Sequence, residues 1–268
     1  MFGTTTGRLS SEKPNLQNIP NKTEMGQKIR EFFVADSKHT FVIADYSQIE
    51  LRVLAHLSDD KNMINMLKNR DADIHSETAA KIFNTNIDSV TKDMRRKAKE
   101  VNFGLIYGME SFGLSKSLDI SKKEADELIK AYFGQFPKIK GFLEKIVVDA
   151  TKNTYTETLY GRKRFIRELS SSNFQVKAMG KRIAMNAPIQ GTASDIMKIA
   201  MIKLIKKLSP LESTNLLLQI HDELAFSVDS PDEAEELARI MEKAAPISVP
   251  NKCDIDIGPS WGEATEVT

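Results

Sequence analysis

The chain has 268 residues, which is enough for one large domain or two moderate ones, with 41% hydrophobic and 28% charged residues. A single cysteine, Cys253, excludes an internal disulfide and favours a reducing compartment. The N-terminus lacks the features of a signal peptide, and no apolar run approaches the roughly 20 residues that cross a bilayer. We therefore expect a cytoplasmic protein with no membrane partner.

The net charge of +1 hides an uneven distribution of charges along the chain. Residues 138–182 contain eleven Lys and Arg against four Asp and Glu, whereas residues 222–268 contain twelve acidic against three basic residues. A neutral total can therefore include a basic face that holds phosphates. Scattered, solvated surface charges explain the same counts, and composition leaves both interpretations open.

The N-terminal half predicts loops and strands followed by helices. The first forty residues are rich in Thr, Ser, Asn and Pro and predict strands and loops. Residues 41–45 form an apolar run typical of a buried strand, and a helical pattern follows through His56. Helical periodicity covers residues 60–150, with predicted breaks at 71–73, 117–121 and Pro137.

The C-terminal half predicts two hairpins separated by a long helical stretch. Residues 154–165 predict a hairpin that turns at Tyr160 and Gly161, and residues 173–208 predict a helix that Pro188 should kink or restart. The remaining predicted elements are strands at 216–220 and 224–228 joined by residues 221–223, a charged surface helix at 232–244, and a last strand with its exit at 255–261. This order predicts an α+β fold in which a helical lobe interrupts a sheet.

Two aspartates are predicted at strand ends. Asp45 ends the first apolar strand, and Asp222 lies at the tip of the second hairpin. Either is explained as a turn residue, but carboxylates held together on rigid strands are also what a pair of Mg²⁺ ions needs for phosphoryl transfer. Ser47 and Glu50 match a capping box that opens a helix, and this role does not exclude a functional one.

Residues 92–108 predict a helix with one cationic and aromatic stripe. Arg95, Lys99, Phe103 and Tyr107 recur every four residues, so that the stripe begins cationic and ends aromatic. A nucleoside triphosphate has the same polarity, because its phosphates and its flat base lie at opposite ends. A surface helix with its aromatic residues in the core is the alternative. Neither phosphate-binding glycine motif, GxxxxGK[ST] or GxGxxG, occurs in the chain.

Taken together, these segments resemble DNA polymerases of family A, the bacterial DNA polymerase I type. Residues 45–52 (DYSQIELR) resemble the family's motif A, residues 95–108 (RRKAKEVNFGLIYG) motif B, and residues 219–223 (QIHDE) motif C. Further matching stretches are 6–11 (TGRLSS), 15–20 (NLQNIP), 158–164 (TLYGRKR) and 186–192 (NAPIQGT). The resemblance covers essentially the whole chain in the right order.

The resemblance implies an antiparallel-sheet palm with an inserted all-helical fingers subdomain, a right-hand polymerase fold lacking the thumb. We expect palm at residues 1–58 and 183–268 and fingers at 59–182. The implied activity is template-directed DNA synthesis, in which the primer 3′-hydroxyl attacks the α-phosphorus of a dNTP and pyrophosphate leaves. We expect a monomer that binds primer–template DNA and dNTPs near the nucleoid. A thumb and exonuclease region would precede residue 8 in the family, so weak DNA affinity and low processivity are expected.

The resemblance also implies a role for each site residue. Asp45 and Asp222 would hold two Mg²⁺ ions with help from the Tyr46 carbonyl, and Glu223 would lie near the metals. Lys99 would donate a proton to the leaving pyrophosphate. The implied dNTP-binding residues are Gln48, Glu50, His75, Arg95, Lys99, Phe103 and Tyr107. The implied DNA-binding residues are Arg8, Arg182, Asn186, Gln190 and His221.

Two of these residues would set nucleotide selection. Glu50 would act as a steric gate against the ribose 2′-hydroxyl. Phenylalanine at position 103 is associated in the family with poor use of dideoxynucleotides, and tyrosine with good use. Two rival functions are a single-subunit RNA polymerase and a nucleic-acid-binding remnant that synthesises nothing.

Overall fold

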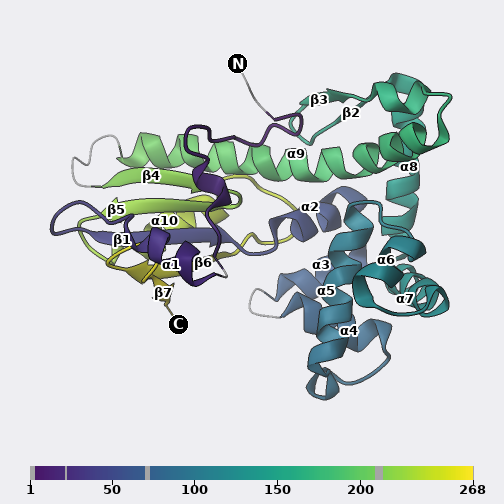
Figure 1. Ribbon diagram of the computed structural model, residues 1–268, viewed down its shortest axis with the longest axis horizontal. Coiled ribbons are helices and arrows are strands. Elements are labelled where there is room, and N and C mark those ends of the chain that lie inside the picture. The colour runs from purple at the N-terminus through teal and green to yellow at the C-terminus, as the bar shows by residue number, and fades with distance from the viewer. Residues whose placement is uncertain (1–3, 22, 70–72, 209–213, 268) are drawn as a thin grey trace. The chain divides into compact units, whose positions relative to one another are not determined.

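The computed structural model describes residues 4–21, 23–69, 73–208 and 214–267 (Figure 1). The chain forms two compact units, which are described separately. The first contains residues 1–49, 193–246 and 251–268, and the second contains residues 50–192 and 247–250.

A five-stranded antiparallel sheet forms the centre of the first unit. Its strand order is β4-β5-β1-β6-β7, with bounds Asn215–Ile220, Glu223–Val228, Thr40–Tyr46, Cys253–Gly258 and Thr265–Glu266. The middle strand β1 buries residues 41–44 completely, as its uninterrupted apolar run predicts for a strand covered on both faces. The predicted α+β class and the hairpin at residues 221–223 are confirmed. The short strand β7 was not predicted.

Different segments pack against the two faces of this sheet. On one face, Phe41, Ile43, Ile220 and Ala225 form a buried cluster with Trp261, which follows the last long strand. The predicted charged helix is α10, Glu233–Glu242, which buries an apolar face and packs against β1 and β6. The hydroxyl of Tyr46 on β1 donates to the carbonyl of Met241 on this helix, so the Tyr46 side chain points into the core.

The N-terminal segment differs from the prediction of strands and loops. It contains a 3₁₀ turn at Leu16–Asn18 and a helix, α1, at Glu24–Glu31, with one isolated bridge at Val34. Thr23 caps α1, and a Cβ at Gly26 would lie 2.1 Å from the Pro20 carbonyl oxygen, so only glycine fits there. Tertiary packing stabilises this short helix, which local composition disfavours.

The second unit consists mainly of helices. Their bounds are Ile49–Ser58 (α2), Lys61–Lys68 (α3), Ile74–Ile82 (α4), Lys92–Ile106 (α5), Ser111–Leu118 (α6), Lys122–Gln135 (α7) and Pro137–Asn153 (α8), with a 3₁₀ turn at Ile87–Ser89. The predicted breaks at 117–121 and at Pro137 are confirmed. The break at 71–73 falls largely outside the described residues, but Asp73 caps α4. No helix among the described residues is long and apolar enough to span a membrane.

A hairpin and a long helix follow α8. Strands β2 (Tyr155–Glu157) and β3 (Lys163–Phe165) confirm the predicted hairpin, and a 3₁₀ turn at Arg167–Ser170 precedes α9 (Phe174–Leu208). Of the kink or restart predicted at Pro188, the restart does not occur, because α9 continues through it as one helix of 35 residues. Pro188 and its neighbours Ala187 and Ile189 are buried, and this packing offsets the roughly 3 kcal/mol that proline costs a helix.

Asp60 joins two helices of the second unit. Its carboxylate accepts hydrogen bonds from the backbone N–H groups of Asn62 and Met63 at the start of α3 and of Lys138 at the start of α8, and the residue is 1% exposed. We expect Asp60→Ala to lower the free energy of unfolding by roughly 2–4 kcal/mol, because three donors lose their acceptor. Urea unfolding measures this. Asp59→Asn, which removes exposed ion pairs and keeps a residue that tolerates the φ of 50° at this position, is the control, and an equal loss in both variants would contradict the prediction.

Candidate functional site

Three carboxylates of the first unit meet at one end of the sheet. Asp45 near the end of β1 and Glu223 at the start of β5 are directly opposite each other in the antiparallel register. Asp222 lies in the two-residue turn between β4 and β5, and its carbonyl accepts a hydrogen bond of 2.9 Å from the Tyr46 amide. The sheet thereby brings Asp45 close to Asp222 and Glu223, which lie 177 and 178 positions later in the sequence. The proximity of Asp45 and Asp222 was predicted.

Loss of water and mutual repulsion perturb these carboxylates strongly. Partial burial raises the pKa of Asp45 to about 7, and four neighbouring carboxylates add to the shift. Burial likewise raises the pKa of Glu223 to about 7, although the charge of Arg30 opposes the shift. Burial also raises the pKa of Asp222, while Arg8 and His221 lower it. The cluster therefore concentrates negative charge that the protein neutralises only in part.

Several predicted residues surround this cluster. The Arg8 guanidinium lies 3.8 Å from the Asp222 carboxylate, and His221 occupies the turn beside it with a positive φ of 51°. Tyr46 has its side chain in the core, which leaves its backbone carbonyl as its only means of binding a metal. Gln48 precedes α2 with a φ of 55°, and its buried Oε1 has no hydrogen-bond partner among the described residues.

The residues present fit a divalent cation. Buried Oε1 of Glu223 accepts no hydrogen bond from any described residue, although Arg30 and a hydrogen bond from Trp261 partly offset the repulsion that Asp222 and Asp256 exert on this carboxylate. Within the described part of the chain, no group of three or more His, Cys, Asp or Glu side chains is arranged to hold a metal. Mg²⁺ is commonly bound by one or two carboxylates and completed by water and substrate phosphates, so Asp45 and Asp222 are the side chains that would hold it.

These pKa shifts predict that stability falls as the pH rises. The Asp45 and Glu223 carboxyls bind protons more tightly in the folded state than in the unfolded state, where their pKa values are 3.8 and 4.5. Their stabilising protons are therefore lost as the pH rises through about 7. Without divalent ions, the melting temperature should be lower at about pH 8.5 than at about pH 5.5, by about 2–4 °C per kcal/mol lost.

Calorimetry of the wild type and Asp45→Asn in EDTA measures this dependence. The variant should show a smaller pH dependence, whereas Asp88→Asn, at an exposed site on a 3₁₀ turn, should follow the wild type. An Asp45→Asn curve that is as steep as that of the wild type would refute the proposed repulsion.

The predicted cationic and aromatic stripe lies on α5 of the second unit. Arg95 and Lys99 are exposed, Phe103 is half-buried, and Tyr107 is the C-terminal capping residue just beyond the helix. The helix ends because Gly108 adopts a φ of 69° and donates to the Leu105 carbonyl. The positive φ favours glycine at position 108, and a Cβ there would also lie 3.3 Å from Arg182 Cα and require Met185 and Arg182 to shift.

His75 is buried beside this stripe and is neutral at pH 7. Burial, together with the positive charges of Arg95 and Lys99, lowers its pKa to about 4, although the charge of Asp73 opposes the shift. The Asn102 amide lies 3.2 Å from His75 Nδ1, and if the amide donates, the proton of the ring is on Nε2. Nε2 is buried and has no partner within the described residues. The ring of Phe103 packs against His75 at a centroid distance of 5.6 Å.

Two further contacts hold the ends of the stripe. Arg95 is ion-paired with Asp73 at the start of α4, with Nε and Oδ2 2.5 Å apart. At the other end, the Tyr107 hydroxyl donates a 2.8 Å hydrogen bond to Glu50, which is 5% exposed. The structure thus brings two predicted nucleotide-binding residues, Glu50 and Tyr107, into direct contact.

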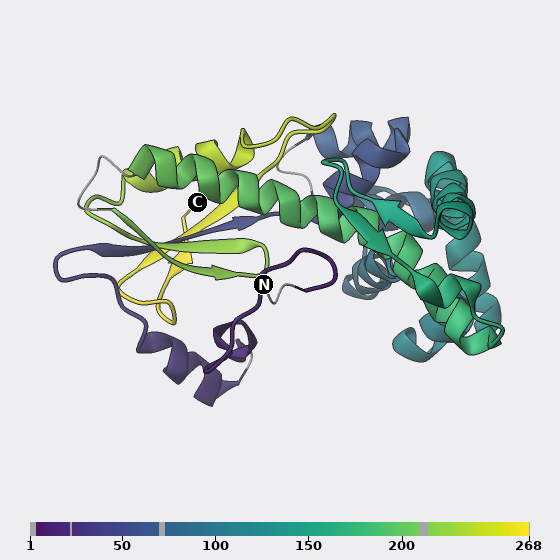
Figure 2. The ribbon, with the colours of Figure 1, turned by 90° about the horizontal axis from the view of Figure 1, so that it is seen from above.

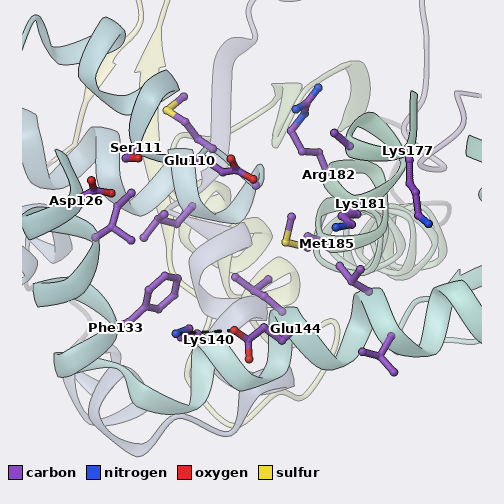
Figure 3. Close-up of a pocket in the computed structure, with 18 of the residues that line it drawn as sticks. Glu110, Ser111, Asp126, Phe133, Lys140, Glu144, Lys177, Lys181, Arg182 and Met185 are labelled. Carbon is purple, nitrogen blue, oxygen red and sulfur yellow. Dashed lines mark ion pairs between the residues drawn. The ribbon is translucent and has the colours of Figure 1, made fainter. Parts of the chain in front are cut away.

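The predicted DNA-binding residues of the second unit lie along α9. Arg182 is exposed, while Asn186 and Gln190 are half-buried one and two turns later. Arg182 borders a groove of about 780 Å³ between α9 and the helices α5 to α8, where Lys177 and Lys181 lie on the same wall (Figure 3). Glu110, Asp126 and Glu144 line the rest, so the groove carries both signs of charge.

Some residues around the site were not predicted. Asp254 and Asp256 on β6 lie opposite Asp45 and Ile43 and contribute to the repulsion, and their alternation in the sequence was the available signal. Asn102, which orients His75, and Asp73, which binds Arg95, had no distinct sequence signal. The carboxylate cluster belongs to the first unit and the stripe on α5 to the second.

Comparisons with known proteins agree with these features. The model of "DNA polymerase family A" matches residues 1–263, and the chain belongs to this family. Similar proteins include DNA polymerase I of Bacillus subtilis, 48% identical over 97% of this chain and 30% of that protein. Another is the thermostable DNA polymerase I of Thermus aquaticus, 45% identical over 98% of this chain and 32% of that protein. The chain thus spans about a third of the curated relatives it matches.

A solved structure is similar over almost the whole chain. It is the POL domain of Pol1 from M. smegmatis in complex with DNA primer-template and dNTP, which is 43% identical with a TM-score of 0.92. The match covers 97% of this chain and 47% of that one. It supports the α+β polymerase fold.

Proposed function

We propose that this chain carries the palm and fingers of a DNA polymerase that adds dNTPs to a primer 3′-hydroxyl and releases pyrophosphate. The observation that carries the proposal is the carboxylate cluster of Asp45, Asp222 and Glu223, which concentrates only partly neutralised negative charge at one end of an antiparallel sheet. Family membership and the named partners of the related structure, primer-template DNA and dNTP, support it.

Asp45, Asp222 and the Tyr46 carbonyl would hold two Mg²⁺ ions, with Glu223 adjacent. Bound Mg²⁺ would stabilise the charge that develops on the attacking and leaving oxygens. The carboxylates would position these ions, and Arg8, which lies 3.8 Å from Asp222, would contact the primer terminus. Positioning and charge neutralisation are the main requirements of phosphoryl transfer.

The stripe on α5 would bind the incoming dNTP. Arg95, Lys99 and the Nε2–H of His75 would bind the β- and γ-phosphates, with Gln48 nearby, and Lys99 Nζ would donate a proton to the leaving pyrophosphate. Phe103 would pack on the sugar and base, and Tyr107 would occupy the templating position until the fingers close. Arg182, Asn186, Gln190 and His221 would contact the primer–template. We further propose a cytoplasmic, nucleoid-associated monomer.

Single-nucleotide extension of a labelled primer–template with Mg²⁺ and the complementary dNTP tests this function. The reaction is run at low salt, because DNA binding weakens steeply as salt rises. Extension with the dNTP and refusal of the matching rNTP is the expected result. Binding of DNA without extension would reject synthesis by this chain, and extension with both nucleotides would reject DNA specificity.

Nucleotide selection at Phe103 provides a further prediction. We expect Phe103→Tyr to increase incorporation of dideoxynucleotides, because the added hydroxyl supplies a hydrogen bond that dideoxyribose lacks. Competition between a ddNTP and its dNTP in the extension assay measures the ratio. Phe103→Leu is the control without a hydroxyl, and a ratio that is unchanged in Phe103→Tyr would contradict the assignment.

A further inference from the structure

The hairpin of β2 and β3 displays aromatic and cationic side chains on its outer face. Antiparallel pairing places Tyr155 opposite Phe165 and Glu157 opposite Lys163, so these four side chains share one face. The other face holds Thr156, which is buried, and Arg164, which is half-buried. On the outer face Phe165 is 67% exposed, a large exposure for an aromatic side chain.

The outer side chains already form a ladder of contacting groups. The rings of Tyr155 and Phe165 meet edge to face with centroids 5.7 Å apart, and the Lys163 ammonium lies 4.5 Å from the Tyr155 ring centroid. At the tip, Leu159 and Tyr160 are 41% and 43% exposed. The ladder therefore offers flat, exposed ring surface next to a positive charge.

The hairpin is held firmly in place within the second unit. The Thr158 hydroxyl accepts from the Tyr160 and Arg162 amides across the turn, and Gly161 adopts a φ of 81°. The Leu159 amide donates to the Thr192 hydroxyl on α9, beside which the hairpin runs (Figures 1 and 2). A buried cluster of Ala150, Ile166, Leu169 and Ala184 lies at its base. Exposed rings on a rigid support lose little entropy on binding.

The charge around the hairpin is strongly positive. Residues 151–167 contain five Lys and Arg against one acidic residue, Glu157. This segment is the centre of the basic region between residues 138 and 182. Its partner should therefore be anionic and should also carry flat apolar groups.

We propose that the outer face of the β2–β3 hairpin binds an unpaired DNA strand, with bases stacked on Phe165 and Tyr160 and phosphates near Lys163. Exposed rings interleaved with cations are what binds single strands without sequence preference, because every base has a stacking face. A duplex keeps its bases stacked inside, and a purely apolar protein partner would not match the charge. The proposal rests on the proposed function, since a polymerase meets unpaired strands during synthesis.

Binding of a labelled single-stranded oligonucleotide of about 12 nucleotides tests the surface directly. Fluorescence anisotropy should show that Phe165→Ala weakens binding about fivefold or more, the loss of one stacked base. Lys163→Ala should reduce the slope of log K against log salt by about 0.7. The matched controls are Phe32→Ala, at a residue that is 82% exposed on the first unit, and Lys206→Ala near the end of α9.

The proposal would be overturned if the hairpin variants had the same oligonucleotide affinities and the same salt slopes as the control variants. All variants should keep the circular dichroism and melting temperature of the wild type, because the substituted side chains are exposed. Extension of a primer on a template that ends at the templating base should also be unchanged. If nothing is extended but Phe165→Ala still weakens oligonucleotide binding, the polymerase proposal fails and the hairpin proposal stands.

Photocrosslinking distinguishes the two possible sources of the strand. 5-Iodouracil is placed either in the 5′ overhang of the template or in a downstream strand that is being displaced, and crosslinked peptides are mapped by mass spectrometry. A crosslink to residues 155–165 in one arm supports the proposal and identifies that strand. Crosslinks to this segment in neither arm would overturn it.

Discussion

Asp222→Asn should reduce the rate of single-nucleotide incorporation by about 1,000-fold or more while primer–template binding stays within a few fold of the wild type. The asparagine keeps the size of the turn residue but removes one negative charge from the carboxylate cluster. Loss of a group that holds a catalytic metal removes several kcal/mol of transition-state stabilisation, and each 1.36 kcal/mol corresponds to a factor of ten in rate. Rapid-quench kinetics measure the rate, and anisotropy measures DNA binding.

Asp254→Asn is the matched control for this substitution. Asp254 lies opposite Asp45 on β6 and carries the same charge, but it ion-pairs with Lys252 and is not a proposed metal ligand. We expect its rate to remain near that of the wild type. Equal losses of incorporation rate in both variants would show that the total negative charge of the cluster matters, rather than one specific metal ligand. An Asp222→Asn variant with the wild-type rate would rule out the proposed metal site.

Glu50→Ala should increase the use of ribonucleotides relative to deoxynucleotides by roughly 10- to 200-fold, the range that one small group is worth in a closed pocket. Glu50 is 5% exposed and is held in one position by the Tyr107 hydroxyl, so its side chain forms a fixed wall. Removing the wall makes room for a 2′-hydroxyl. The ratio of kcat/KM for the matching rNTP and dNTP measures the effect.

Two variants distinguish the effect of the volume of the Glu50 side chain from the effect of its hydrogen bond with Tyr107. Glu50→Gln keeps the volume and an acceptor for Tyr107, so it should still exclude ribonucleotides. Tyr107→Phe removes the hydroxyl but leaves Glu50, so discrimination should fall by less than in Glu50→Ala. If Glu50→Ala and the wild type discriminate equally, Glu50 does not act as a gate.

Both substitutions address residues whose environments combine charge and burial. Asp45, Asp222 and Glu223 are held near one another at a cost in electrostatic free energy, and Glu50 is almost fully buried. Natural proteins accept such costs where function requires them. The clustering of raised carboxyl pKa values at one end of the sheet therefore supports a binding role for this end rather than a purely structural one.

Local sequence patterns were sufficient for much of the fold and pointed to two strand-end aspartates and one helical stripe as candidate site residues. The apolar run at 41–44, the turn at 221–222 and the four-residue spacing from Arg95 to Tyr107 predict β1, the β4–β5 hairpin and the stripe on α5. These features depend on backbone periodicity and turn chemistry, which act over a few residues. The family was predicted differently, from the resemblance of several contiguous motifs in the right order, and the match to the family model confirms it.

Other features were decided by contacts between distant segments. Helix α1 is short and exposes Met25 and Phe32, yet it is fixed in place because Arg30 stacks on Trp261 and only glycine fits at positions 26 and 262. Helix α9 continues through Pro188 because burial outweighs the lost hydrogen bond. In both cases the stabilising free energy comes from tertiary contacts. Helix α1 is stabilised by segments more than a hundred residues away in the sequence, and helix α9 by the surrounding core, and neither contribution is part of local helix propensity.

The chemical state of the site also depends on the tertiary structure. The sequence alone determines which residues carry carboxylates, imidazole and cations, because these are properties of single side chains. Only the fold places Asp45 beside Glu223 and Asp254, buries His75 behind Asn102, and joins Tyr107 to Glu50. Charge repulsion and loss of water act through space over a few ångströms, so the pKa values and contacts of these residues follow from the folded structure and not from their order along the chain.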